Sequence, residues 1–541
     1  MRSSSLTRAL LGSVVLAALT AAPAVANTEL HILHLNDFHS RIESINRFNS
    51  TCSAGDEAEG KCFGGAARIM TLVTQMRDAL TAEGHPVLVL DAGDASQGSL
   101  FYTTYRGQAE ADFLERLGID AMAVGNHEFD NGPEGLAVFL DTLTAPVISS
   151  NLDVSASNLL AGRVAPYAIL EAGDLRVGVV SALATDTVET SSPGPTVAFA
   201  DEIEAMTAAV AELQAQGVAP IIALTHVGYA ADQRIAAAVP GLAAVIGGHS
   251  HTYLSASDPA RQGPYPTWVD AESGGIVPVV QAGAYGRWLG HLVLELDDDG
   301  NLVYATGDTI EINAEVTPDP DVAAWVAGLA GPIEETRQRP VGVSAGPIDG
   351  DRAVCRQREC SMGNLVSDAM LARVADQGIS IAIQNGGGLR ASIDEGEITM
   401  GEVLTVLPFQ NTLSTFQLSG ADVIAALENG VSQLEEGAGR FAQVAGLRYT
   451  FDPAAPAGSR VSDVMVNIEG EWTPIDPSAT YGVVSNNFMR AGGDGYRMFR
   501  DNAMNAYDYG PDLADVVAEY IAGLGADYVP YTDGRITRLG D

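Results

Sequence analysis

Short apolar runs alternate with longer alanine-rich segments of helical period from residue 28 to about residue 315. Strands buried on both faces are continuous runs of Val, Ile and Leu, whereas amphipathic helices repeat apolar residues every three to four positions. An α/β domain is therefore expected. Its predicted strands lie at 30–35, 86–91, 121–125, 146–150, 175–181, 220–225, 243–248 and 278–283. The segment "WLGHLVLELDDDGNLVYA" (288–305) predicts a hairpin that turns at Asp-Gly-Asn.

The pattern changes near residue 317. "TPDPDVAAWVAGL" (317–329) places Pro and Asp before an apolar periodic run, which is typical of a helix start. We interpret 317–340 as a connecting helix and linker that follows a first domain over 27–316. A second α/β unit is expected over 341–541, and its apolar segments lie at 379–390, 401–413 and 481–496.

The first 26 residues resemble a secretory signal peptide. Arg2 and Arg8 precede the apolar stretch "ALLGSVVLAALTAA", and the small residues "AVA" follow at 24–26. The mature chain is expected to begin at Asn27. No later run reaches the ~18 apolar residues of a membrane span, and the C-terminus is polar. We therefore predict a periplasmic or extracellular protein without a membrane anchor.

The four cysteines form two local pairs in the sequence, Cys52 with Cys62 and Cys355 with Cys360. Four cysteines allow three connectivities. Export favours oxidation, and the short loops favour two local disulfides. A zinc site built from all four cysteines is the alternative, although neither pair has the usual C-x2-C spacing.

The composition is strongly acidic, with 69 Asp and Glu residues against 29 Lys and Arg residues and a formal net charge of −40. Such a surface disfavours nucleic acid and anionic membranes as partners. An anionic small-molecule substrate would need a local cluster of arginines. The charge does not indicate an oligomeric state.

Polar side chains follow five of the predicted strands, and ligands of α/β folds bind outside the carboxyl ends of the strands. A lone histidine at a strand end is ordinarily a solvated loop residue, but five separate strand ends with such groups favour a metal site. Five of the nine histidines lie there: His39, His127, His226, His249 and His251. The other four are expected to have structural roles: His31, His34, His85 and His291.

The types of candidate ligand indicate the metal. Imidazole, carboxylate and amide groups together suit Zn2+ or Mn2+. The set is too large for one tetrahedral ion, and it fits two ions about 3.5–4 Å apart, bridged by a carboxylate. Glycines that precede Asp94, Asn126 and His249 would let the backbone turn sharply, so that the side chains converge.

These strand-end motifs resemble those of the calcineurin-like metallophosphoesterases: "DFH" at 37–39, "GD" at 93–94, "GNHEFD" at 125–130, His226, and "GHSH" at 248–251. The segments "CRQRECSMGNL", "NGGGLR", "LPFQNTL" and "NNFMRAGGDGY" resemble the C-terminal domain of the secreted 5'-nucleotidases. The resemblance covers nearly the whole mature chain. It implies a four-layer αββα domain, followed by a mixed α/β domain that binds substrate.

The resemblance also implies roles for the strand-end residues. It assigns Asp37, His39 and His251 to a first ion, and Asn126, His226 and His249 to a second. Asp94 would bridge the two ions. His127 and Asp130 would form a catalytic pair that stabilises charge on the phosphoryl group.

The second domain is implied to bind the substrate. The residues that this assigns are Arg356, Arg358, Asn385, Arg390, Phe409, Asn411, Phe488 and Asp494. The expected activity is removal of the 5'-phosphate from nucleotides, with UDP-sugars and nucleoside di- or triphosphates as further candidates. The alternatives are a 2',3'-cyclic-nucleotide phosphodiesterase, a sulfur-ester hydrolase, and a nucleotide-binding protein without activity.

Overall fold

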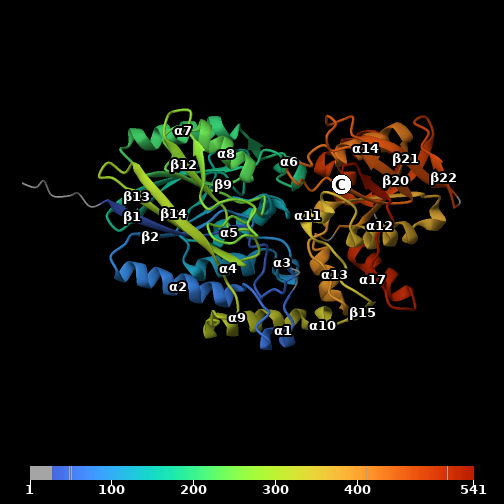
Figure 1. The fold of residues 1–541 in the computed structure, drawn as a ribbon, viewed down its shortest axis with the longest axis horizontal. Coiled ribbons are helices and arrows are strands. Elements are labelled where there is room, and N and C mark those ends of the chain that lie inside the picture. Colours follow the sequence, from blue (N-terminus) through green and yellow to red (C-terminus); the bar gives the residue numbers. More distant parts are fainter. Residues whose placement is uncertain are drawn as a thin grey trace, which may run out of the picture.

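The protein is described by a computed structural model that covers residues 27–540, apart from 48, 50, 410, 469 and 509. The predicted signal peptide, 1–26, lies outside the described residues. Two lobes lie side by side, and a helical segment along one edge connects them (Figure 1). No helix in the described ranges has the length and apolar character that a membrane crossing requires.

Two six-stranded sheets form the N-terminal lobe. The first has the order β14 (Leu302–Glu311), β13 (Trp288–Leu296), β1 (Thr28–Leu35), β2 (Val87–Asp91), β3 (Ala121–Ala123), β4 (Val147–Ile148). The second has the order β11 (Thr267–Asp270), β12 (Ile276–Val280), β10 (Ala244–Ile246), β9 (Ile221–His226), β7 (Leu175–Leu183), β6 (Tyr167–Ala172). All eight predicted strands and the predicted hairpin are confirmed, and the hairpin extends to Glu311.

Successive side chains of a strand point to opposite faces of the sheet, which divides the core of this lobe into layers. In β1, Leu30 and Ile32 pack against the second sheet, whereas Leu33 and Leu35 face the helices. Three helices cover the first sheet: α2 (Ala66–Ala82), α4 (Gln108–Leu117) and α5 (Pro133–Thr142). Two cover the second: α7 (Glu202–Ala215) and α8 (Tyr229–Ala238). The four-layer αββα prediction is therefore confirmed.

The connecting segment contains the predicted helix as α9 (Pro320–Ala330), followed by α10 (Glu334–Arg337). Asp319 begins α9, because its side chain accepts hydrogen bonds from the backbone N–H groups of Asp321 and Val322. Val322 is buried against the helical face of the first lobe. This contact anchors the linker to the N-terminal lobe.

A five-stranded sheet forms the centre of the C-terminal lobe, in the order β19 (Ala442–Ala445), β16 (Ile381–Asn385), β23 (Thr480–Asn486), β18 (Leu413–Ser419), β24 (Met504–Tyr507). The helices around it include α11 (Arg352–Cys355), α12 (Ser361–Arg373), α13 (Met400–Val406), α14 (Gly420–Gly430), α15 (Asn487–Arg490) and α17 (Leu513–Gly523). A smaller sheet has the order β22 (Glu471–Pro474), β21 (Val461–Ile468), β20 (Leu447–Phe451), β25 (Ile536–Arg538). The mixed α/β prediction is confirmed.

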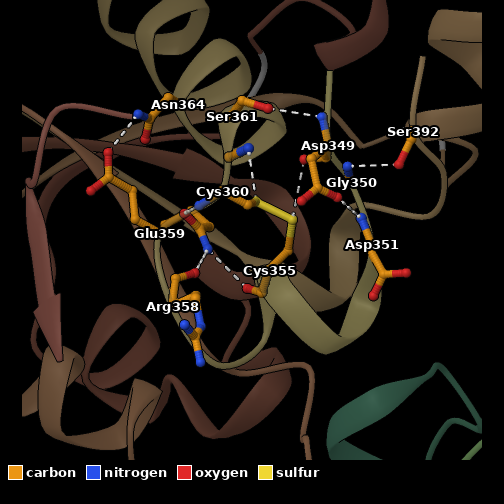
Figure 2. The surroundings of a disulfide bond; sticks show 12 residues. Asp349, Gly350, Asp351, Cys355, Arg358, Glu359, Cys360, Ser361, Asn364 and Ser392 are labelled. Carbon is orange, nitrogen blue, oxygen red and sulfur yellow. Dashed lines mark hydrogen bonds between the residues drawn. A yellow bond between two sulfur atoms is a disulfide. The ribbon is translucent and has the colours of Figure 1, made fainter. Parts of the chain in front are cut away.

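Both predicted disulfides are present, Cys52–Cys62 and Cys355–Cys360, and the four-cysteine zinc alternative is excluded. The second disulfide joins the end of α11 to the residue that begins α12 (Figure 2). Within the loop it closes, the carbonyl groups of Cys355 and Arg358 both accept hydrogen bonds from Gln443. The disulfide and Gln443 thus hold the short loop that contains Arg356.

Candidate metal centre and active site

The loops that follow β1, β2, β3, β9 and β10 meet at one edge of the two sheets. Left-handed backbone conformations are concentrated here, with φ values of 50–73° at non-glycine residues. Such conformations cost free energy and persist where the surrounding structure imposes them, often at functional sites. The residues concerned are Ser40 and Gln97, together with Asp37, His39, Asp94, His249 and His251. The last five of these are predicted ligands.

The predicted ligand atoms lie within 4 Å of one another in several pairs. His251 Nε2 lies 2.9 Å from His39 Nε2 and 3.1 Å from Asp37 Oδ1. In the second set, His249 Nδ1 lies 2.8 Å from Asn126 Oδ1. Asp94 lies between the sets, because its Oδ2 is 3.8 Å from His39 Nε2 and 3.0 Å from His226 Nε2. The ligands therefore form two adjoining groups that share Asp94.

Hydrogen bonds to backbone carbonyls fix the orientation of two imidazoles. His39 Nδ1 lies 3.1 Å from the carbonyl oxygen of Gln97, and His226 Nδ1 lies 2.7 Å from that of Ala92. Each Nδ1 must carry a proton, which leaves Nε2 as the nitrogen that would face a metal ion at the centre of the site, as in metal-binding histidines. His226 Nε2 is buried beside the Asp94 carboxylate, with Asp94 Oδ2 at 3.0 Å. This donor set fits a pair of divalent cations.

Buried charges crowd the site. Burial is the largest influence on Asp37 and raises its pKa to about 6, against the lowering effect of His226. Burial also acts to raise the pKa of Asp94, but His226 and His127 outweigh it and hold that pKa well below its usual range. Carboxylates and imidazoles packed so closely are suited to bind cations.

Glu128 braces the loops that carry two of the ligands. Its buried carboxylate accepts hydrogen bonds from the backbone N–H groups of Asp94, Ser96 and Gly125 at 2.8–3.0 Å. No side chain fits at Gly125, because a Cβ there would lie 2.2 Å from the Asp94 nitrogen. Glu128 lies within "GNHEFD", a motif that does not by itself indicate this role.

We expect Glu128→Gln to weaken metal binding by about 10–100-fold, the usual cost of losing a group that orients ligands. The glutamine side chain directs its own N–H groups at backbone N–H donors. Two donors cannot pair, so the loop of Asp94 shifts. Calorimetric titration with Zn2+ or Mn2+ measures the change. Glu134→Gln, an exposed carboxylate in the first turn of α5, is the control and should bind as the wild type does. Equal affinity in both variants would contradict the role of Glu128.

His127 and Asp130 lie beside the ligands. His127 Nδ1 is 2.7 Å from Asp130 Oδ2, and Asp130 also accepts hydrogen bonds from Gln97 and Ser191. Burial favours the neutral ring, but the charges of Asp130 and then Asp94 outweigh it and raise the pKa of His127. His127 Nε2, 3.9 Å from Asp94 Oδ2, faces the ligand set. The pair can therefore present a proton donor to a molecule bound there.

A cavity of about 1060 Å³ lies between the lobes and joins this site to the C-terminal lobe. Its lining includes predicted ligands and the catalytic pair, together with seven of the eight predicted substrate-binding residues: Arg356, Asn385, Arg390, Phe409, Asn411, Phe488 and Asp494. Arg358 differs from the prediction, because its side chain is exposed and does not line the cavity. Arg358 lies two residues past Arg356, on the outer side of the disulfide loop.

Arg352 lines the cavity instead, and sequence reasoning missed it. Its Nη2 lies 3.4 Å from the carbonyl oxygen of His249, and Arg390 Nη2 lies 3.2 Å from His39 Nε2. Arg356 Nε is buried without a hydrogen bond, and burial, then the charges of Arg352 and Arg390, lower the pKa of Arg356. None of the three forms a salt bridge with a residue that the structure describes. This cluster of guanidinium groups is suited to bind an anion.

Asn385 and Asp494 contact each other on the wall of the cavity, where Asn385 Nδ2 donates to Asp494 Oδ2 at 2.6 Å.

The Phe409 ring lies close to residues of both lobes. Its centroid is 5.7 Å from that of His127 in the first lobe and 5.5 Å from the guanidinium group of Arg390 in the second. Ser250 is not directed at the ligands, because its hydroxyl accepts from the N–H of Tyr229 and donates to Gln281.

Comparison with known proteins agrees with this arrangement. The family model for calcineurin-like phosphoesterases matches residues 30–253, and that for the 5'-nucleotidase C-terminal domain matches 340–501. The chain is 38% identical to the 5'-nucleotidase of Bos taurus and 37% identical to that of Homo sapiens, over 95% of this chain and 92% of each relative. The crystal structure of a 5'-nucleotidase precursor from Thermus thermophilus superposes with a TM-score of 0.89 at 41% identity, covering 95% of this chain and 100% of that one. The chain therefore belongs to the 5'-nucleotidase family and has its N-terminal calcineurin-like phosphoesterase domain.

Proposed function

We propose that this protein is a metal-dependent phosphohydrolase that removes the 5'-phosphate from nucleotides. The observation that carries the proposal is a cavity between the lobes, with a ligand set for two cations on one wall and arginine and aromatic side chains on the other. Residues 27–316 would supply the cation site, 317–340 the linker, and 341–541 the nucleotide contacts.

Two divalent cations, Zn2+ or Mn2+, suit the mixture of imidazole, carboxylate and amide ligands. Asp37, His39 and His251 would hold one, and Asn126, His226 and His249 the other, with Asp94 shared. When bound, such a pair activates water and stabilises both the attacking and the leaving oxygen of phosphate esters.

The chain's own groups position the phosphate. Arg352, Arg356 and Arg390 would bind phosphoryl oxygens through charge-assisted hydrogen bonds, which satisfies the buried Arg356 Nε. His127 would donate its Nε2 proton to an oxygen on which negative charge develops, while Asp130 holds the ring through Nδ1. The hydrogen bonds of Gln97 and Ser191 keep the Asp130 carboxylate in place.

Phe409 and Phe488 would stack on the base, since stacking on aromatic faces tolerates different bases. Asn385, Asn411 and Asp494 would bind polar groups of the base and ribose. The cavity, at about 1060 Å³, has room for more than a mononucleotide, so UDP-sugars and nucleoside di- or triphosphates belong in any substrate panel. The two disulfides are compatible with a periplasmic or extracellular location.

Phosphate release from AMP, before and after chelation and again after addition of Mn2+ or Zn2+, tests the proposal. We expect activity that chelation abolishes and either ion restores. Hydrolysis of 2',3'-cyclic nucleotides to 2'- or 3'-monophosphates, with no phosphate release from AMP, would favour the phosphodiesterase alternative. Nucleotide binding without any release, under every metal, would favour a binding protein and overturn the proposal.

Phe409→Ala should raise KM for AMP by about 5- to 150-fold, because one base-stacking contact contributes about 1–3 kcal/mol. The turnover number should change less, since the side chain contacts the nucleoside and not the phosphate. Phe409→Tyr keeps the aromatic face and is the matched control. Equal KM values for the two variants, measured by phosphate release, would show that Phe409 does not stack on the base.

A further inference from the structure

Three histidines outside the active site cluster on the helix-facing side of the first sheet. His31 lies on β1, His291 on β13, and His85 in the loop before β2. The ring centroids of His31 and His85 are 4.7 Å apart, and those of His31 and His291 are 5.2 Å apart. Roughly 13 Å of strand separates His31 from Leu35, where the active-site loop begins. β1 starts on the side of its lobe away from the C-terminal lobe (Figure 1).

A carboxylate completes this group. Glu29 lies two residues before His31 in β1, so both side chains are on the same face of the sheet. Its Oε2 is 3.8 Å from His31 Nε2 and also 3.8 Å from His85 Nδ1. All three ligand atoms lie within 4.8 Å of one another. Ligand atoms around a tetrahedral zinc ion lie about 3.4 Å apart, so only a small inward movement is required.

His31 is oriented as a metal ligand would be. Its Nδ1 lies 3.0 Å from His291 Nε2, whereas its Nε2 is buried and makes no hydrogen bond. The residue is 7% exposed, so no layer of water replaces the missing partner. If Nδ1 donates its proton to His291, the lone pair of Nε2 is directed at the space between Glu29 and His85. This is the usual arrangement of a metal-binding histidine and its outer partner.

The surroundings favour a cation. Burial and then the neighbouring His85 lower the pKa of His31. Glu29 and Glu83 are the carboxylates whose charge acts on this ring. Glu29 and His85 are partly exposed, so an ion and a water ligand can enter from solvent.

We propose that Glu29, His31 and His85 bind a third divalent cation, Zn2+, with water as the fourth ligand and His291 as the positioning residue for His31. The donor set of two imidazoles and one carboxylate suits Zn2+. The ion would tie the loop before β2 to the first strand of the domain. It lies outside the cavity and takes no part in the proposed hydrolysis.

Counting zinc ions per chain tests the proposal. After loading the full chain with Zn2+ and removing unbound metal, elemental analysis should find one ion fewer in His85→Ala than in the wild type. Phosphate release from AMP by His85→Ala should remain at the wild-type rate, because the variant leaves the active-site ligands intact. The difference between the two proteins does not depend on how many ions the active site holds. Equal zinc content in both proteins would overturn the proposal.

A pair of matched carboxylate variants separates coordination from general electrostatics. Glu29→Gln and Glu83→Gln each remove one negative charge that acts on His31, but only Glu29 offers a ligand atom to the group. Glu29→Gln should weaken this zinc site by at least about tenfold in a zinc titration, and Glu83→Gln by much less. Equal weakening in the two variants would show that the histidines attract cations without binding one directly.

Discussion

Asp94→Asn is expected to lose both active-site cations and to lower turnover with AMP by at least about 10³-fold. Asp94 is 2% exposed, and its Oδ2 lies within 4 Å of nitrogen atoms in both ligand groups. The amide has almost the same shape but no negative charge to share between two cations. Elemental analysis and phosphate release, measured on the same preparation, report the two effects together.

Asp91→Asn is the control for this variant. Asp91 is also buried, three residues earlier, and accepts a hydrogen bond from the N–H of Gly93. Burial raises the pKa of Asp91 well above its usual range, so a neutral amide is a close substitute. The control should keep its metal ions and most of its activity. An active Asp94→Asn variant that retains both ions would refute the bridging role.

His127→Ala should lower turnover by about 10²–10³-fold, the usual cost of removing one donor that stabilises the charge of a transition state. Its metal content should be unchanged, because the neighbouring ligands come from Asn126 and from other loops. The effect should fall on kcat more than on KM, since the proposed contact strengthens as charge develops on the phosphate oxygen. Metal analysis and steady-state kinetics with AMP measure both quantities.

Asp130→Asn tests the contribution of the negative charge beside His127. The Asn side chain can still accept a hydrogen bond from His127 Nδ1 but no longer stabilises a charged ring. Its loss of turnover should therefore be smaller than that of His127→Ala. Full activity in His127→Ala would remove the residue from the mechanism, and loss of metal in that variant would assign it to coordination instead.

Much of the first lobe could be predicted because its strands are continuous apolar runs. Polar residues at the ends of five such strands then identify the candidate ligands without knowledge of loop shape, since parallel strands end at a common edge. Short strands such as β5 (Leu152–Asp153) and β8 (Ala198–Phe199) were not predicted. Two residues offer too little periodicity to be recognised.

The remaining site residues depend on contacts between segments distant in sequence. Arg352 reaches the His249 carbonyl only because the C-terminal lobe lies against the N-terminal one. Glu128 looks like any acidic residue in a turn until three backbone N–H groups are seen to converge on it. Arg358 and Arg356 are equivalent in the sequence pattern, and only the path of the disulfide loop distinguishes them.

The cluster of histidines outside the active site could not be predicted from the sequence for the same reason. His31, His85 and His291 occur in separate segments with no common motif, and a structural role was the reasonable expectation for each. Strand pairing places His291 opposite Leu33, which brings it next to His31 on one face of the sheet. This register gives His31 Nδ1 a partner in His291, while His31 Nε2 has none.

Anomalous scattering from crystals grown with Zn2+ tests the central claim most directly. Two peaks about 3.5–4 Å apart are expected between the loops after β1, β2, β3, β9 and β10, with the Asp94 carboxylate in contact with both. A single peak there, or none, or a pair of peaks without Asp94 between them, would contradict the account.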